Sequence, residues 1–234
     1  MVKSSQLVLD EVAFTADINP TDLPTGPIAD LLIGMTGATT AAAAITGVTL
    51  LKTISLLRIF SDGLKTELSG IELLAYNVLA LGNVPVKVNS GAAATNPCSL
   101  ENLLLPMNLP SGKKAQVQCV YAAQTNLGSG VMAIHASSLE RLPGPFTGLQ
   151  RKPITPTVTA AYGNKLDISM SGAKIAGLLL YSTTIPTATA VTTSLHKLRI
   201  LIGGKVHSEY NWRNLGQVGH QRTGDADIDG AIDN

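Results

Sequence analysis

Hydrophobic and polar residues alternate over short stretches of this chain, a pattern typical of β-strands rather than long helices. Most of these stretches are rich in β-branched and aliphatic residues and are followed by Gly, Pro, Asn or Asp. The dipeptide Asp62-Gly63 separates the runs LLRIF and LKTEL, which predicts a tight hairpin. We predict strands within 6–18, 31–35, 48–60, 113–122 and 131–136.

One segment, SGIELLAYNVLALG, fits a helix better than a strand. Ser69 is a suitable N-cap, and Glu72, three residues later, completes the capping-box pattern. A stripe of Leu, Ile and Val follows, and Gly82 is a C-terminal stop. We therefore predict a short helix near 71–81.

The segment 31–51 carries no charge and is long enough to be considered as a membrane span. It contains five threonines and three glycines, and it lacks the aromatic and basic flanks that anchor a spanning helix. We interpret it as two strands joined by small residues. A membrane protein built around this segment is a third hypothesis, after the two developed below.

The composition narrows the classes of function. Of the 234 residues, 45% are hydrophobic and 14% are charged, and the net charge is +1. A disordered chain needs lower hydrophobicity and higher net charge, and binding to nucleic acid through its phosphates needs a basic face. Soluble domains carry about 25% charged residues, so the deficit indicates surface covered by other subunits or by a membrane.

The chain divides at a segment rich in Pro and Gly, within 142–156. We predict a first domain over 1–142, a linker over 143–156, and a second domain over 157–234 that ends in a flexible acidic tail. The halves repeat locally, because 57–74 aligns with 198–215 without a gap. The identities are Leu57/Leu198, Arg58/Arg199, Ile59/Ile200, Gly63/Gly204 and Leu74/Leu215.

Each half thus reads as a strand, a glycine turn, a second strand and an amphipathic segment. This order resembles the double jelly-roll major capsid proteins of icosahedral viruses and membrane-containing phages. The resemblance implies an all-β fold, a jelly-roll β-sandwich with two tandem rolls and short helices after a strand hairpin. In the first roll, a loop would run over 83–97 and a strand pair would lie around 100–109. The chain departs from the family after residue 215, where too few residues remain to complete a second roll.

The resemblance also implies a function. The chain would be a structural virion protein that self-assembles as a homotrimer with lateral contacts in the capsid shell. Its further partners would be minor capsid or vertex proteins and an internal membrane, with no sequence-specific contact to nucleic acid. We expect no enzyme activity, because the motifs of nucleophile elbows, zinc proteases and phosphate loops are absent and the four histidines are scattered. Cys98 and Cys119 are interpreted as core thiols rather than as a disulfide framework.

One short motif near the end of the chain suggests a metal site. Asp225, Asp227, Asp229 and Gly230 match positions 1, 3, 5 and 6 of a calcium loop, whereas the acid expected at position 12 is missing. Calcium is the one cofactor that the sequence suggests, and the alternative is a solvated acidic tail. A second hypothesis is a lectin-like β-sandwich that binds its ligand with calcium, in which the segment 210–212 (Tyr-Asn-Trp) supplies an aromatic platform.

Overall fold

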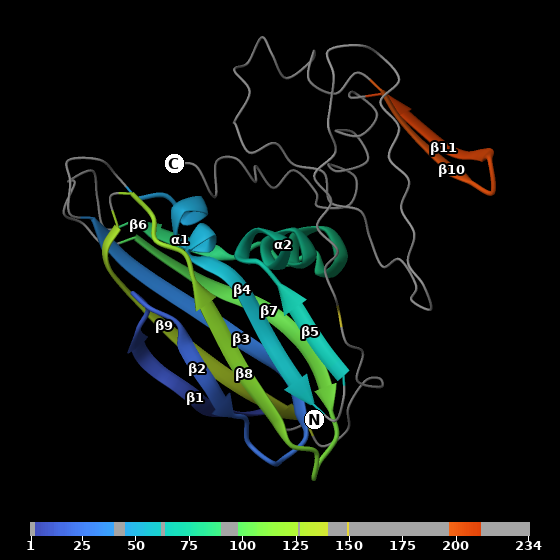
Figure 1. Cartoon of the computed structure of the whole chain (residues 1–234). Coiled ribbons are helices and arrows are strands. Elements are labelled where there is room, and N and C mark those ends of the chain that lie inside the picture. The colour runs from blue at the N-terminus through green and yellow to red at the C-terminus, as the bar shows by residue number, and fades with distance from the viewer. Residues whose placement is uncertain are drawn as a thin grey trace.

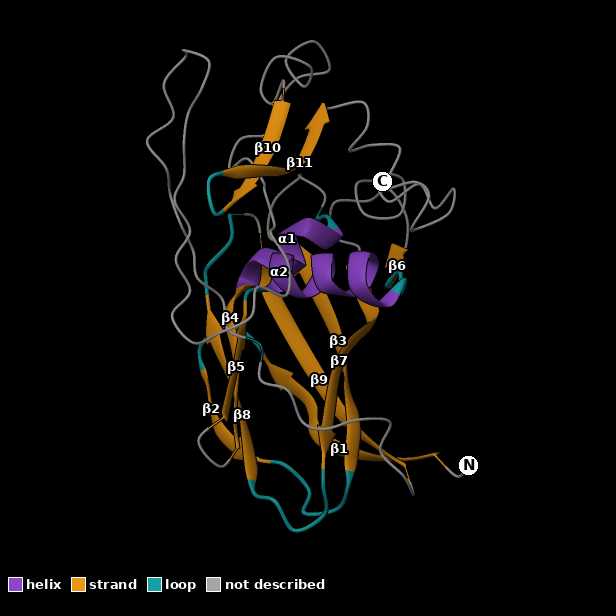
Figure 2. Ribbon diagram, turned by 90° about the vertical axis from the view of Figure 1, so that its right-hand side faces the viewer, coloured by secondary structure: helices purple, strands orange, loops and turns teal. Residues whose placement is uncertain are grey.

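Two antiparallel sheets face each other across a hydrophobic core, as the computed structural model shows (Figures 1 and 2). The prediction of a mostly β chain is confirmed, and the fold is a β-sandwich. The structure describes residues 3–39, 45–61, 64–89, 98–125, 127–139, 149 and 197–211.

The first sheet has five strands, and every neighbouring pair is antiparallel. Its central strand, β3, covers the predicted strand at 31–35 and extends it at both ends. Across the sheet the order is β1 (Lys3–Ala13), β9 (Leu127–Leu139), β3 (Ile28–Thr39), β7 (Cys98–Leu109) and β6 (Val86–Asn89).

The second sheet has four strands and contains the predicted hairpin. Leu57 faces Leu68 and Ser61 faces Leu64 across β4 and β5, so the two strands form the predicted hairpin, while residues 62 and 63 lie outside the described residues. Across the sheet the order is β2 (Ile18–Asp22), β8 (Ala115–Tyr121), β4 (Ile54–Ser61) and β5 (Leu64–Leu68).

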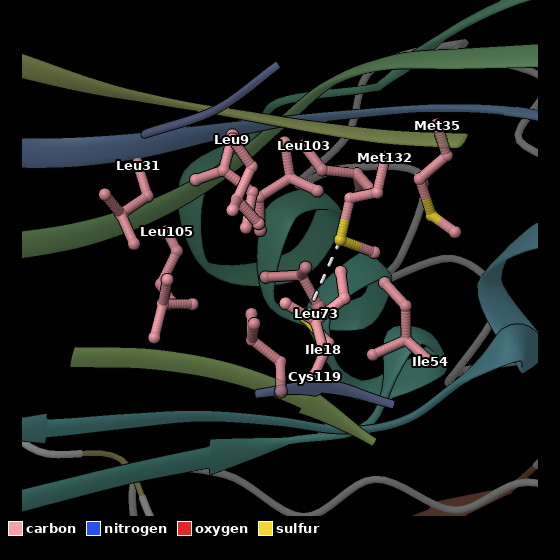
Figure 3. Packing of buried hydrophobic residues seen from close by; sticks show 14 of the residues in the cluster. Leu9, Ile18, Leu31, Met35, Ile54, Leu73, Leu103, Leu105, Cys119 and Met132 are labelled. Carbon is pink, nitrogen blue, oxygen red and sulfur yellow. Dashed lines mark hydrogen bonds between the residues drawn. The ribbon is translucent and has the colours of Figure 1, made fainter. Parts of the chain in front are cut away.

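The core lies between the sheets and is built from alternate residues of their strands. Leu31, Ile33 and Met35 of β3 point inward and are at most 3% exposed, while the residues between them are half-buried. Leu57 and Ile59 of β4 meet them from the other sheet. Figure 3 shows this interior, where Met132 of β9 and Cys119 of β8 approach across the gap. Burying each such side chain contributes about 1.5–3 kcal/mol.

Helices close one end of the sandwich (Figure 2). α2 (Gly70–Ala75) begins at Ser69, whose side chain accepts a hydrogen bond from the Glu72 amide, while Glu72 bonds back to the Ser69 amide. The predicted capping box is therefore confirmed. The helix continues as a π-helix, η1 (Tyr76–Leu81), and ends at Gly82 with a φ of 62°, as the glycine stop predicted.

A third helix corrects the sequence prediction of a strand over 48–60. α1 (Gly47–Thr53) occupies the first part of that range, and β4 begins only at Ile54. The Thr46 side chain caps α1 by accepting from the Thr49 amide, and Leu50 and Leu51 are buried in the core. Packing of this short helix overrides the β preference of its Val and Thr residues. Among the described residues, no helix is long and apolar enough to cross a membrane.

Two further predictions for the first half are wrong in detail. The expected strand pair around 100–109 is the single strand β7, because a bulge with Asn102 at a φ of 64° lets pairing with β3 continue past it. The expected loop over 83–97 contains β6, which pairs with the first part of β7. The predicted strands at 113–122 and 131–136 are confirmed as β8 and β9.

Beyond residue 149 the structure describes one hairpin. β10 (Lys197–Ile202) and β11 (Lys205–Asn211) pair with each other around Gly203 and Gly204, which have φ of 58° and 79°. Glycine adopts such angles without a steric penalty, so this turn depends on both residues. The rest of the predicted linker and second domain lies outside the described residues.

Candidate functional site

A charged cluster lies on the outer face of the four-stranded sheet. The Glu67 carboxylate of β5 lies 3.0 Å from Nε of Arg58 and 2.6 Å from Nζ of Lys65. The hydrogen bond from Lys65, opposed by partial burial and aided by Arg58, holds the pKa of Glu67 below its ordinary value. Gln118 of β8 accepts a further bond from Arg58. Two cations pair with the one carboxylate, so the cluster presents no unpaired carboxylate as a catalytic base.

The β10–β11 hairpin carries a cluster of the same kind. Glu209 lies 2.7 Å from Nε of Arg199 and 2.6 Å from Nζ of Lys197. Hydrogen bonds from Lys197 first, and Arg199 second, lower the pKa of Glu209. Arg199 and Glu209 face each other across the strands, as Arg58 and Glu67 do. Both hairpins therefore join an arginine, a lysine and a glutamate.

A buried polar centre joins the π-helix to β7. The Asn77 side chain is fully buried, and its Nδ2 donates to the carbonyl oxygens of Leu73 and Leu104, each at 2.8 Å. Its Oδ1 accepts from the Leu104 amide at 2.8 Å and from Asn83 Nδ2 at 2.7 Å. Every hydrogen-bonding position of the amide is used. Asn77 thus takes the place of a neighbouring strand at the edge of β7.

The outer edge of β5 is covered by residue 149. The Glu67 amide donates to the Leu149 carbonyl at 2.7 Å, and the Leu149 amide donates to Thr66 Oγ1 at 3.2 Å. Leu149 also packs against the core cluster. Leu149 therefore occupies one backbone donor at the free edge of β5, so that this donor is not offered to another chain.

The outer faces of the two sheets differ in chemistry. The four-stranded sheet presents charged and amide groups, including Asp22, whose carboxylate accepts from Gln116. Between its inward residues the five-stranded sheet presents mainly small and apolar groups. The charged residues among them include Asp30, bonded to the buried Ser137, and the exposed Glu101 of β7. We call this set the outer face of the five-stranded sheet: Ser5, Leu7, Asp30, Leu32, Gly34, Thr36, Ser99, Leu104, Pro106, Val131, Ala133, His135 and Ser137.

The predicted calcium residues Asp225, Asp227 and Asp229 lie outside the described residues, as does Trp212 of the proposed aromatic platform. Within the described parts of the chain, no group of three or more His, Cys, Asp and Glu residues could hold a metal ion.

Both cysteines are buried in the core, where the sequence predicted them. Burial raises the pKa of the Cys119 thiol to about 12, and its Sγ lies 3.6 Å from the Met132 sulfur. A thiol that stays protonated and buried is a packing group rather than a nucleophile.

Sequence reasoning missed both Asn77 and the outer face of the five-stranded sheet. Asn77 was visible as a lone amide inside the apolar run ELLAYNVLAL, a position where a buried polar group needs partners. The outer face could have been suspected from Leu32, Gly34 and Thr36, which occupy the alternate positions of β3 where charged residues are expected.

Comparison with known proteins adds no relative. No model of a protein family matches the chain, and no curated protein matches it.

Proposed function

We propose that this chain is a structural virion protein, the self-assembling major capsid protein of an icosahedral virus or phage. The observation that carries the proposal is the order of strands in the two sheets. Low charge, the small and apolar outer face of the five-stranded sheet, and a second hairpin of the same design support it.

The strand order supports a jelly roll. With the short edge strand β6 set aside, the eight remaining strands are β1–β5 and β7–β9. One sheet takes the first, eighth, third and sixth of these, and the other takes the second, seventh, fourth and fifth. Two nested Greek keys produce this interleaving, which characterises the jelly rolls of capsid and lectin domains.

The second hairpin supports a tandem roll in 157–234. Near their turns the two hairpins pair in the same way. Phe60 faces Lys65 in the first hairpin, and the aligned residues Leu201 and Val206 face each other in the second. A bulge after Ile200 then shifts the pairing by one residue, so that Arg199 faces Glu209. In the ungapped alignment the residue equivalent to Glu67 is Ser208, not Glu209. The bulge explains why the glutamate of the second hairpin lies one position later in the sequence. The two hairpins thus share a cross-strand Arg–Glu pair, although Lys65 lies on β5 beside the glutamate and Lys197 lies on β10 beside the arginine.

The low charge of the chain supports assembly. Subunit contacts place charged groups under a desolvation penalty, and interface centres are depleted in them. At 14% charged residues, this chain is suited to a homotrimer with lateral contacts in a capsid shell. Contacts to minor capsid or vertex proteins, or to an internal membrane, would follow from the same location in the virion.

Negative-stain electron microscopy combined with light scattering of the purified chain tests the proposal. We expect trimers of pseudo-hexagonal outline, or closed shells, that become more abundant as concentration rises. A monodisperse monomer at every concentration and salt level would refute it. In that case the lectin-like hypothesis would be the next to examine, by titration with sugars and calcium.

The tandem roll is tested by two substitutions in β10. The alignment pairs Ile200 with the buried Ile59 and Leu201 with the outward Phe60. If a second roll forms, Ile200→Asp should lower the midpoint of thermal unfolding much more than Leu201→Asp. Equal effects of the two variants would contradict a second core behind this hairpin.

A further inference from the structure

We propose that the outer face of the five-stranded sheet is the surface by which one copy of this chain binds a second copy. This inference rests on the proposed function and adds to it the surface and the partner. It is carried by the chemistry, relief and size of that face.

The face has the composition of an interface centre. Leu7, His135, Leu32 and Leu104 lie directly opposite one another on four adjacent strands and form one continuous row. An antiparallel sheet that meets water on its outer side normally places polar or charged residues at such positions. The aliphatic side chains Leu32 and Leu104 are half-buried, and they lose their remaining contact with water when another molecule covers them.

Small residues on the face leave room for a copy of the same face. Beside the row of larger side chains lies a lower strip, where Gly34 of β3 faces Ala133 of β9. A Cβ added to Gly34 would have nothing within 4 Å, so the space above this strip is open. In a two-fold arrangement the row of one copy would lie over the strip of the other, and the reverse contact would form at the same time.

The charged groups lie to the sides of the row of larger side chains. Asp30, bonded to Ser137, lies near the start of β3, and the exposed Glu101 of β7 lies beside β6. The exposed acidic residues Asp10 and Glu11 lie at the margin, in the bulged part of β1. An uncharged centre with a charged margin is the usual anatomy of a protein interface.

The size of the face fits a reversible contact. Four strands at about 4.8 Å spacing, and the β3 span from Asp30 to Ala38 at about 3.4 Å per residue, give on the order of 500 Å² per copy. Two copies together would bury about 1,000 Å², the lower end for a specific interface. Such a contact is weak between two copies and becomes strong when a shell repeats it.

Paired substitutions test the proposal. Gly34→Glu places one charge at the centre of the face in open space, whereas Gln118→Glu adds the same charge to the four-stranded sheet, beside Arg58. Light scattering across a dilution series should show that Gly34→Glu raises the concentration for half-maximal assembly about tenfold or more. Gln118→Glu should assemble as the wild type does. Equal assembly of both variants and the wild type would overturn the proposal while leaving self-assembly intact.

A second measurement needs no variant. Diethyl pyrocarbonate modifies accessible histidines, and mass spectrometry can follow His135 on the face together with exposed His207 on β11 as a reference. We expect His135 to react in the dilute monomer and to become protected on assembly. If His135 is already fully protected in the monomer, the chain covers its own face. If the reactivity of His135 does not change on assembly, the contact lies elsewhere. Either result overturns the proposal. A wild-type chain that never assembles would overturn both this inference and the proposed function.

Discussion

Replacing Asn77 with alanine should destabilise the fold far more than its small size suggests. The substitution removes both hydrogen bonds to Leu104, whose amide and carbonyl point away from β3 toward the edge of the sheet. Each buried backbone group left without a partner costs about 1–3 kcal/mol, so the two groups together cost about 2–6 kcal/mol. Alanine favours helix over asparagine by about 0.5 kcal/mol, which offsets a small part. We expect a loss of about 3 kcal/mol.

Urea denaturation followed by circular dichroism measures this loss, and hydrogen exchange at the Leu104 amide locates it. The matched control is Asn83→Ala, because Asn83 donates to Asn77 and to the Asn102 carbonyl from a less buried position. That variant should lose about 1 kcal/mol. If Asn77→Ala unfolds within 0.5 kcal/mol of the wild type, about the usual range for a surface substitution, the view of Asn77 as a substitute strand is wrong.

Three further predictions follow from packing and titration. Gly70→Ala should destabilise the fold by about 1–3 kcal/mol, because its Cβ would overlap the Leu51 carbonyl oxygen, whereas Gly26→Ala, with nothing within 4 Å, should stay near the wild type in the same denaturation assay. The free energy of unfolding of the wild type, compared with that of Glu67→Gln, should fall as the pH drops from about 5, because the lowered pKa of Glu67 favours the folded state only while the carboxyl group is ionised. A difference between the two proteins that does not change with pH would contradict the ion pair. Cys119 should react with a thiol reagent at pH 8 only as fast as the protein opens, and an immediate reaction in native buffer would show that the thiol is accessible.

Local signals in the sequence predicted the parts of the fold that local forces determine. The β4–β5 hairpin and the Ser69–Glu72 capping box need only neighbouring residues, and both lie where the pattern placed them. α1 was missed because its Val and Thr residues favour strands in isolation, and burial of Leu50 and Leu51 decides otherwise.

The candidate sites were harder to predict because they depend on partners distant in sequence. Asn77 and Leu104 are 27 residues apart, and the row through His135 joins four strands from both ends of the first half. No periodicity within one segment reveals which outward residues become neighbours across a sheet. The repeat of the Arg–Glu pair was likewise visible only in part, because one bulge displaces Glu209 from its aligned position.

The pairing of β1 with β9 has a consequence for synthesis on the ribosome. Lys3 faces Leu139, so β1 has no partner strand until β9, the last strand of the sandwich, has been synthesised. At about 5–20 residues per second, that interval is roughly 7–27 s. During it the nascent β1 can pair with the β1 of a neighbouring ribosome on the same message. The positive φ of Glu11 and the irregular stretch from Leu7 to Val12 make this strand a poor template for such pairing, and so give the nascent chain time to finish.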